Sequence, residues 1–409
     1  MRRRIVFQPR VSGVGQRGRW SAERIVRGAM ICLLLGTGCP HAAASDAVAA
    51  ADRQPGARVD SDQAWPVFRG DAAMTGVARS PLPEKLDLRW TFMAAKGGFE
   101  ATAALADGLV FVGGSNGKFY AIDLASGQQR WEFATESSFT APAAVQGSLV
   151  FVGDSDGRFH CLDAPTGARR WYFDTESEIN GGANFFADAV LVASQDAMLY
   201  CLDRETGTLR WKYESENQIR CTPSIAEGRA FVAGCDAVLH VIDLNSGKRV
   251  GQAELEDYTG CTPAIVGSMA YVGTEGRQLL AVDWKQGRIV WKYEAASRAQ
   301  AFRSSAAVTD TRVIAGGQDK LVHAVDRASG QPVWTFATRG RVEGSAVVVG
   351  QRVFVGSNDG RLYALDLACG KELWRFEAGG HILASPAVAQ GCLVVGNDAG
   401  QLYCFGLQP

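Results

Sequence analysis

The stretch GLVFVGGSNGKFYAIDLASGQQRWEF, residues 108–133, decides the fold of this chain. It contains an apolar run, a turn with Asn and Gly, an alternating run, an Asp-x-x-x-Gly turn and a final run that includes Trp131. The pattern returns as SLVFVGDSDGRFHCLDAPTGARRWYF at 148–173 and as RVFVGSNDGRLYALDLACGKELWRF at 352–376. Each unit has one aspartate at the same place, which we call the marker aspartate. Successive marker aspartates are 40 residues apart, except for one interval of 43 between Asp283 and Asp326. They are Asp123, Asp163, Asp203, Asp243, Asp283, Asp326 and Asp366. A fixed period in this range, with short β-type runs in each unit, predicts a propeller.

Each unit contains four short runs with the period-2 alternation of β-strands. The pairs Asn116-Gly117 and Asp156-Gly157 suit tight hairpins, because Gly, Asn and Asp tolerate positive φ better than other residues. One small four-stranded sheet cannot bury both of its faces. Neighbouring units are therefore expected to stack and to close into a ring.

A tryptophan stands eight residues after most marker aspartates, and a small residue such as Ala121 or Cys161 stands two residues before them. We interpret these tryptophans as flat rings that dock on a thin, Gly-containing turn and bind the blades together. The fourth unit has Gly251 at this position, so its contact is expected to be the weakest. The docking residues are Trp90, Trp131, Trp171, Trp211, Trp291, Trp334 and Trp374.

The run Ala-x-Asp-x-x-x-Gly-x-x-x-Trp, as in residues 121–131, resembles the tryptophan-docking motif of the quinoprotein (PQQ-like) β-propeller repeat family. The resemblance covers residues 86–409, and the opening 65–70, WPVFRG, resembles the lead-in of bacterial members. Members of similar size include the lipoprotein of the outer-membrane β-barrel assembly machinery. The resemblance implies an all-β, eight-bladed propeller over residues 85–409. The last unit stops at Gly406, and residues 85–92 supply its missing strand, with Trp90 at the vacant tryptophan position.

The N-terminal region differs from the repeats. Residues 1–44 contain an arginine-rich start and a short apolar run, which predicts an export signal. Two processing sites fit: Cys39 follows Thr-Gly as in a lipoprotein, and 42–44 offer three alanines to an ordinary signal peptidase. Residues 45–64 are expected to be a flexible tether, and residues 65–84 an N-terminal lead-in segment. The expected location is the periplasm or, if Cys39 is lipidated, the outer membrane.

Composition excludes some functions. The net charge of −1 gives no basic surface for nucleic acid, and we expect a monomer. The cysteines show no CxxC spacing, so we expect no metal. Cys161, Cys201 and Cys404 occupy the small-residue position and are expected to be buried, whereas Cys221 and Cys261, one repeat apart, would allow a disulfide between blades.

A second set of equivalent positions carries different charges in different units, although the residues next to these positions are similar from unit to unit. Aligning the units at the first strand brings together Glu100, Asn180, Arg220, Arg303 and Glu343, each preceded by a bulky apolar residue. In the family this strand lines the central channel, so the resemblance implies a polar funnel at one channel mouth. We hypothesise that it binds a ligand or a peptide segment. The alternative is a water-filled channel in which Arg303 pairs with Glu343.

Three functions remain at this stage. The favoured one is a non-enzymatic, exported scaffold that binds protein partners in the cell envelope, as in outer-membrane protein assembly, without a cofactor. Strand edges and broad faces would serve such a partner. The second is a dehydrogenase that depends on pyrroloquinoline quinone (PQQ) and Ca²⁺; the family's enzymes are longer and often carry adjacent cysteines, which this chain lacks. The third is a ligand-binding or sensor propeller at the cell surface.

Overall fold

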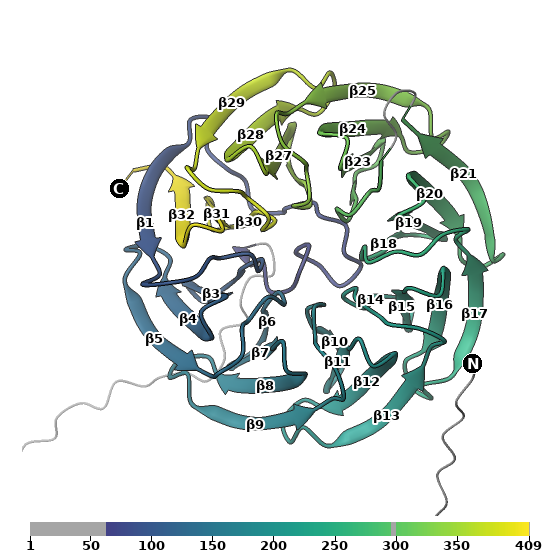
Figure 1. Cartoon of the computed structure of the whole chain (residues 1–409), viewed down its shortest axis with the longest axis horizontal. Coiled ribbons are helices and arrows are strands. Elements are labelled where there is room, and N and C mark those ends of the chain that lie inside the picture. Colours follow the sequence, from purple (N-terminus) through teal and green to yellow (C-terminus); the bar gives the residue numbers. More distant parts are fainter. Residues whose placement is uncertain (1–62, 296–299, 409) are drawn as a thin grey trace, which may run out of the picture. The chain divides into compact units, whose positions relative to one another are not determined.

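Eight antiparallel sheets of four strands surround a common centre in the computed structural model, which describes residues 63–295 and 300–408 (Figure 1). The prediction of an all-β, eight-bladed propeller is confirmed. Within the described residues no helix is long and apolar enough to cross a membrane. The predicted export signal, with Cys39, lies outside the part of the chain that the structure describes.

The strands follow one another from the channel to the rim in each blade. Blades 1 and 2 are formed by β2 (Ala104–Ala106), β3 (Leu109–Gly113), β4 (Lys118–Asp123), β5 (Gln129–Ala134), β6 (Ala144–Gln146), β7 (Leu149–Gly153), β8 (Arg158–Asp163) and β9 (Arg169–Asp174). Blades 3 and 4 are formed by β10 (Asn184–Phe186), β11 (Ala189–Ala193), β12 (Met198–Asp203), β13 (Leu209–Glu214), β14 (Ser224–Ala226), β15 (Arg229–Ala233), β16 (Val238–Asp243) and β17 (Arg249–Glu254).

The second half repeats this order. Blades 5 and 6 are formed by β18 (Ala264–Val266), β19 (Met269–Gly273), β20 (Gln278–Asp283), β21 (Arg288–Glu294), β22 (Ala307–Val308), β23 (Arg312–Gly316), β24 (Leu321–Asp326) and β25 (Pro332–Ala337). Blades 7 and 8 are formed by β26 (Val347–Val349), β27 (Arg352–Ser357), β28 (Arg361–Asp366), β29 (Glu372–Glu377), β30 (Ala387–Ala389), β31 (Cys392–Gly396), β32 (Gln401–Gly406) and β1 (Asp87–Met93).

The two ends of the propeller meet in blade 8. Strand β1 is antiparallel to β32, with Trp90 opposite Cys404 and Asp87 opposite Gly406, and a β-bulge lies between Leu88 and Trp90. The closure by residues 85–92 is thus confirmed. Since β1 takes the outer position in a sheet made otherwise from the C-terminus, the ring has no gap (Figure 1).

Tryptophan rings lie on glycines of the next blade. Trp171 Nε1, for example, donates to the carbonyl oxygen of Arg204 at 3.1 Å, and its ring lies against Gly207. A Cβ atom at Gly207 would come within 2.6 Å of the ring, and φ is +72° there, so the turn requires glycine. Six tryptophans make the same hydrogen bond to the next blade: Trp90, Trp131, Trp171, Trp211, Trp291 and Trp334. Trp374 instead packs edge-to-face on Phe405, with 5.4 Å between ring centroids, because blade 8 has no docking turn.

The contact between blades 4 and 5 is made differently. Gly251 leaves the usual tryptophan position of β17 empty, and Trp284, which follows the marker Asp283 of blade 5, enters from the opposite side. Its ring is edge-to-face with Phe231 at 5.0 Å, and its Nε1 donates to Gly267 O at 3.0 Å. This interface therefore contains a large aromatic ring, and that it is the weakest of the blade contacts stays a prediction.

Residues 65–80 run along one end of the channel and touch all eight blades (Figure 1). Backbone hydrogen bonds join this segment to the innermost strands of six blades, beginning with Trp65 and Leu105 and ending with Ala78 and Val348. Blade 3 contributes the side chain of Asn184, and blade 8 contributes the amide of Gly391. The segment therefore covers this end of the channel with backbone.

Arg69 of this segment is fully buried. Its Nη2 donates to the carbonyl oxygens of Ala306 and Ala346, and burial lowers its pKa to about 9. Gly76, with φ of +70°, gives the guanidinium its room, because a Cβ atom there would overlap it. Arg69 thus holds the segment against blades 6 and 7.

Candidate functional site: the channel mouth

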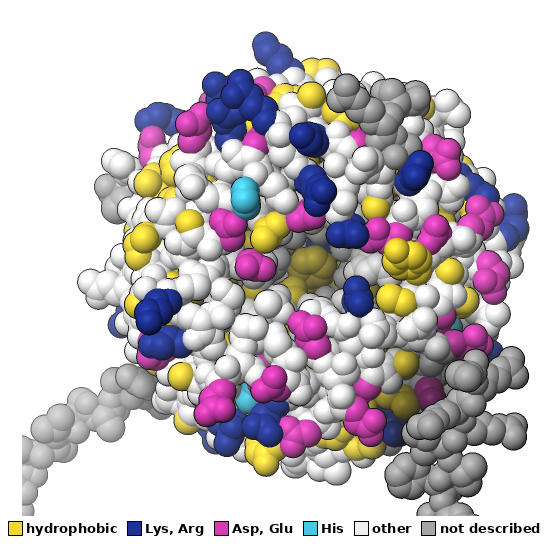
Figure 2. Space-filling model, viewed as in Figure 1, with side chains coloured by type: hydrophobic (Ala, Val, Ile, Leu, Met, Phe, Trp, Pro, Cys, Tyr) yellow, Lys and Arg dark blue, Asp and Glu magenta, His cyan; other side chains and the backbone are white. Residues whose placement is uncertain are grey.

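The face opposite the covered end carries a central hollow with an apolar floor and charged side chains of both signs around it (Figure 2). Seven of the eight blades enter this mouth through a buried apolar residue that precedes the first strand, and blade 5 has the buried Thr259 there. Phe139 packs on Gly113, and Ile179 packs on Gly153; a Cβ atom at these glycines would lie 2.4 and 2.3 Å from them. This close approach fixes the next residue of the chain at the rim of the hollow.

The predicted mouth residues differ in their surroundings. Arg303 forms two hydrogen bonds with Glu275 of blade 5, Nε to Oε1 at 2.7 Å and Nη2 to Oε2 at 3.3 Å. This contact raises the pKa of Arg303. Glu343 accepts hydrogen bonds from Gln318 Nε2 at 3.2 Å and Asn358 Nδ2 at 3.0 Å. Arg303 and Glu343 are therefore not paired with each other, and the alternative that joined them is wrong.

The other three residues are held less firmly. Asn180 Nδ2 donates to Glu178 Oε1 at 2.7 Å, and Asn180 also accepts from Gln195. Arg220 is exposed, and its Nη2 donates to Gln218 Oε1 at 2.8 Å. Glu100 is exposed and has no hydrogen bond or ion pair among residues 63–295 and 300–408. The mouth thus presents a fixed cation at Arg303 and a fixed anion at Glu343, with freer charges at Arg220 and Glu100.

A ring of hairpin residues supports these side chains and was missed in the sequence. Each lies eight residues before the marker position, which is aspartate in seven blades and Gly406 in blade 8. Its amide donates to a carbonyl oxygen at the mouth of the same blade, as Glu275 does to Tyr258 at 3.0 Å. The ring comprises Ser115, Ser155, Gln195, Cys235, Glu275, Gln318, Asn358 and Asp398. Aligning the units at this position would have found it.

Deeper in the channel, a belt of buried hydroxyl groups joins neighbouring blades. The amide of one blade donates to the hydroxyl of the next, for example Thr222 N to Thr262 Oγ1 at 3.0 Å and Ser305 N to Ser345 Oγ at 2.9 Å. Six such bonds run from Gly182 to Thr102, and the belt is interrupted at Pro142, which has no N–H. These polar groups satisfy one another and hold the inner strands in register.

Buried histidines lie beside aspartates inside the blades. His240 Nε2 lies 2.8 Å from Asp236 Oδ2, and its Nδ1 lies 3.0 Å from the hydroxyl of Tyr213. Burial alone would raise the pKa of Asp236, but the hydrogen bond and electrostatic attraction of His240 and the bonds from backbone amides together outweigh burial, so the net pKa is lowered. The other oxygen of Asp236 accepts from the amide of Val238 at 3.2 Å, as Asx residues in turns commonly do.

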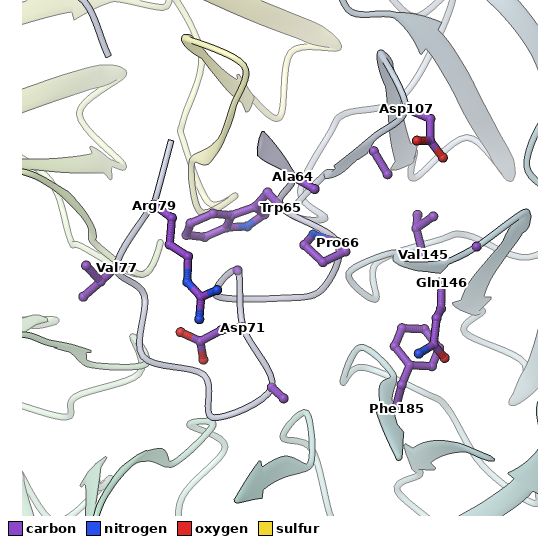
Figure 3. A pocket seen from close by; sticks show the side chains of 14 residues that line it. Ala64, Trp65, Pro66, Asp71, Val77, Arg79, Asp107, Val145, Gln146 and Phe185 are labelled. Carbon is purple, nitrogen blue, oxygen red and sulfur yellow. The ribbon is translucent and has the colours of Figure 1, made fainter. Parts of the chain in front are cut away.

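A second cavity, of about 490 Å³, lies at the covered end between residues 65–80 and blades 1 to 3 (Figure 3). Trp65, Pro66, Val145 and Phe185 give it apolar walls. The carboxylate of Asp71 and the guanidinium of Arg79 point toward each other beside it (Figure 3).

The residues at the mouth do not fit a pair of PQQ and Ca²⁺. Such a cation needs several converging oxygen ligands, but Glu100, Asn180 and Glu343 belong to blades 1, 3 and 7. Asn180 and Glu343 already have hydrogen-bond partners. Within the described ranges, no group of three or more His, Cys, Asp or Glu side chains could hold a metal ion.

Known protein families and solved structures identify what this chain is similar to. A family model described as outer membrane protein assembly factor BamB matches residues 47–180, 155–318 and 318–405. The chain belongs to this family. It is a BamB-type member of the PQQ-like propellers, although no curated protein matches it significantly.

Solved structures show the same fold. BamB from Moraxella catarrhalis is 22% identical, with a TM-score of 0.67, and the match covers 79% of this chain and 98% of that one. The quinohemoprotein alcohol dehydrogenase from Comamonas testosteroni is 16% identical, with a TM-score of 0.74 over 86% of this chain and 82% of that one. The computationally designed Ika8 protein is 15% identical, with a TM-score of 0.70 over 79% of this chain and 100% of that one. Identities this low establish the fold alone.

Proposed function

We propose that this BamB-type propeller is a non-enzymatic scaffold of the cell envelope whose open channel mouth binds a segment of a protein partner, in the context of outer-membrane protein assembly. The observation that carries the proposal is the contrast between the two ends of the channel. One end is covered by the backbone of residues 65–80, and the other carries the charged side chains described above.

The mouth suits recognition of a polypeptide. Arg303 and Glu343 are held by neutral or oppositely charged neighbours, so little side-chain entropy is lost when a partner binds them. Arg220 and Glu100 add charges that can adjust to the partner. Complementary charges of both signs favour an extended segment with mixed charge over a purely acidic or basic one.

Capture from envelope extracts tests the proposal. The tagged protein should retain subunits of the outer-membrane assembly machinery, and R220A combined with R303A should lower their yield about fivefold or more, as expected for the loss of 1–2 kcal/mol. The matched control removes two arginines at the rim, R158A with R169A, which stack on Tyr172 at 4.7 and 4.9 Å. Equal yields from both double variants would refute a role for the mouth.

Location and activity have their own tests. We propose that the protein is exported and anchored through Cys39; C39S should release it from membranes without changing its fold, whereas unchanged fractionation would refute the anchor.

Addition of PQQ and Ca²⁺ should produce no alcohol-dependent dye reduction, and observed turnover would establish the dehydrogenase alternative.

A further inference from the structure

Arg89 lacks the partner that its equivalents have in other blades. Equivalent arginines pair with the marker aspartates, Arg130 with Asp123 at 2.6 Å and Arg210 with Asp203 at 2.6 Å. The β-bulge in β1 lies at Arg89, as the bulge in β5 lies at Arg130, so both arginines occupy the same position in their strands. Blade 8, however, has Gly406 at the marker position, 40 residues after Asp366. The guanidinium therefore has no carboxylate at the marker position of its own blade.

A cysteine takes the place of that carboxylate. Arg89 Nη1 donates to Cys392 Sγ at 2.8 Å, and Arg89 Nη2 donates to Ala125 O at 3.4 Å. The thiol of Cys404, on the neighbouring strand β32, belongs to the same buried cluster as Cys392. This neighbouring thiol and the guanidinium of Arg89 together lower the pKa of Cys392 to about 6, against the effect of burial.

Other cysteines in the protein show the opposite behaviour. Burial raises the pKa of Cys161 and of Cys221 to about 12 and that of Cys201 to about 11. Cys392 is as buried as they are, with 1% of its surface exposed, but it differs from them because Arg89 donates a hydrogen bond to its sulfur. A cation beside the sulfur favours the thiolate, which is the nucleophilic form of cysteine.

A pocket of about 490 Å³ reaches Cys392 where blade 8 meets blade 1. Its walls include Arg89, Asp107, Asp123 and Arg130. These residues and Cys404 are the charged or titratable groups around the sulfur. Arg89 belongs to β1, the strand that closes the ring, so a group attached to Cys392 would lie beside that strand.

We propose that Cys392 is a nucleophilic thiolate and a site of reversible S-thiolation by low-molecular-weight disulfides that enter this pocket. The thiolate attacks one sulfur of RS–SR, a new S–S bond forms at Cys392, and the other sulfur leaves as RS⁻ and takes a proton from solvent. The protein sulfur and one RS group are joined in a mixed disulfide, so no further oxidant is required. The modified sulfur has no charge, and Arg89 loses its anionic partner at the seam.

The pH dependence of labelling distinguishes this site from an ordinary thiol. The reduced full-length protein is treated with iodoacetamide or oxidised glutathione from pH 5 to pH 9, and each cysteine is quantified by peptide mass spectrometry. Between pH 8 and pH 6 the rate at Cys392 should fall only about twofold, whereas a thiol of ordinary pKa loses about 70-fold. Cys161 and Cys201 are internal references for buried thiols.

Two variants test the role of the guanidinium. R89Q should move the labelling profile of Cys392 upward by about one pH unit or more, whereas R130Q, in the same pocket but paired with Asp123, should leave it unchanged. Labelling of Cys161 in either variant would reveal unfolding. If R89Q does not fold, the labelling profile of Cys392 in the wild-type protein alone decides the test. Absence of labelling at Cys392 throughout, or a profile that follows Cys161, would overturn the proposal.

Discussion

The docking glycines allow a direct measurement of how tightly the blades are held together. We consider G207A, because Gly207 has φ of +72° and faces Trp171, whose ring atoms would lie 2.6 and 2.7 Å from a new Cβ atom. The ring cannot easily withdraw, since its Nε1 is bonded to Arg204 O and it packs on Phe151. An alanine in the left-handed region costs about 1–2 kcal/mol, and overpacking adds about 1–3 kcal/mol. The expected loss in the free energy of unfolding is therefore about 2–5 kcal/mol.

G228A is the matched control. Gly228 has nearly the same φ, +70°, but no atom lies within 4 Å of the position of its Cβ. This variant should lose only the backbone contribution of about 1–2 kcal/mol. Both variants are measured by urea denaturation followed by tryptophan fluorescence and circular dichroism.

A double-mutant cycle completes the experiment. In a W171A background, G207A should cost no more than G228A does, because the ring that opposed the Cβ atom is gone. If G207A and G228A are destabilised equally, within about 0.5 kcal/mol, in the wild-type background, the ring does not press on the turn and the docking argument fails.

Three further predictions concern other parts of the ring. W284A should lower the free energy of unfolding by about 2–4 kcal/mol in urea denaturation, because its ring packs on Phe231 between the two blades; a loss below about 1 kcal/mol would contradict this role. A197G and A237G should each raise the melting temperature, since φ is +69° and +60° at these alanines and glycine relieves the strain; a lower melting temperature for both would contradict it. The hydrogen bond from Arg210 lowers the pKa of Asp203 to about 2, so D203N should be destabilised at neutral pH, and its difference from the wild type should disappear as pH falls from about 4 through 2; a difference independent of pH in urea denaturation would contradict the ion pair.

The architecture could be predicted because it depends on positions that repeat. The marker aspartates and the tryptophans recur at fixed spacing, and Trp90 is recognised as the missing member of the last unit because that unit stops at Gly406. Trp284 could not be predicted in the same way. It stands outside the repeated tryptophan position and acts only because the neighbouring blade has Gly251.

The candidate site was predicted in part. The five mouth residues follow from aligning the first strands, but their partners depend on a second ring of positions, in the hairpins, that was not aligned. Glu275 in that ring, rather than Glu343, pairs with Arg303. The path of residues 65–80 could not be predicted either, because most of its bonds are between backbone atoms and leave no pattern of side chains in the sequence.

The two ends of the channel are built from different chemical groups, and this difference bears on where recognition occurs. Backbone amides and carbonyls, which close one end, are the same in every polypeptide, so they fix a segment in place without selecting it by sequence. Side chains such as Arg303 and Glu343 at the other end distinguish one partner from another through charge and hydrogen bonding. Because the chain's own lead-in already forms hydrogen bonds with all eight blades, six of them through bonds between backbone groups, a partner at the channel is left with the side-chain end. Substitutions at the mouth should therefore change which partner binds. Substitutions in residues 65–80 that keep the backbone in place should leave the choice of partner unchanged.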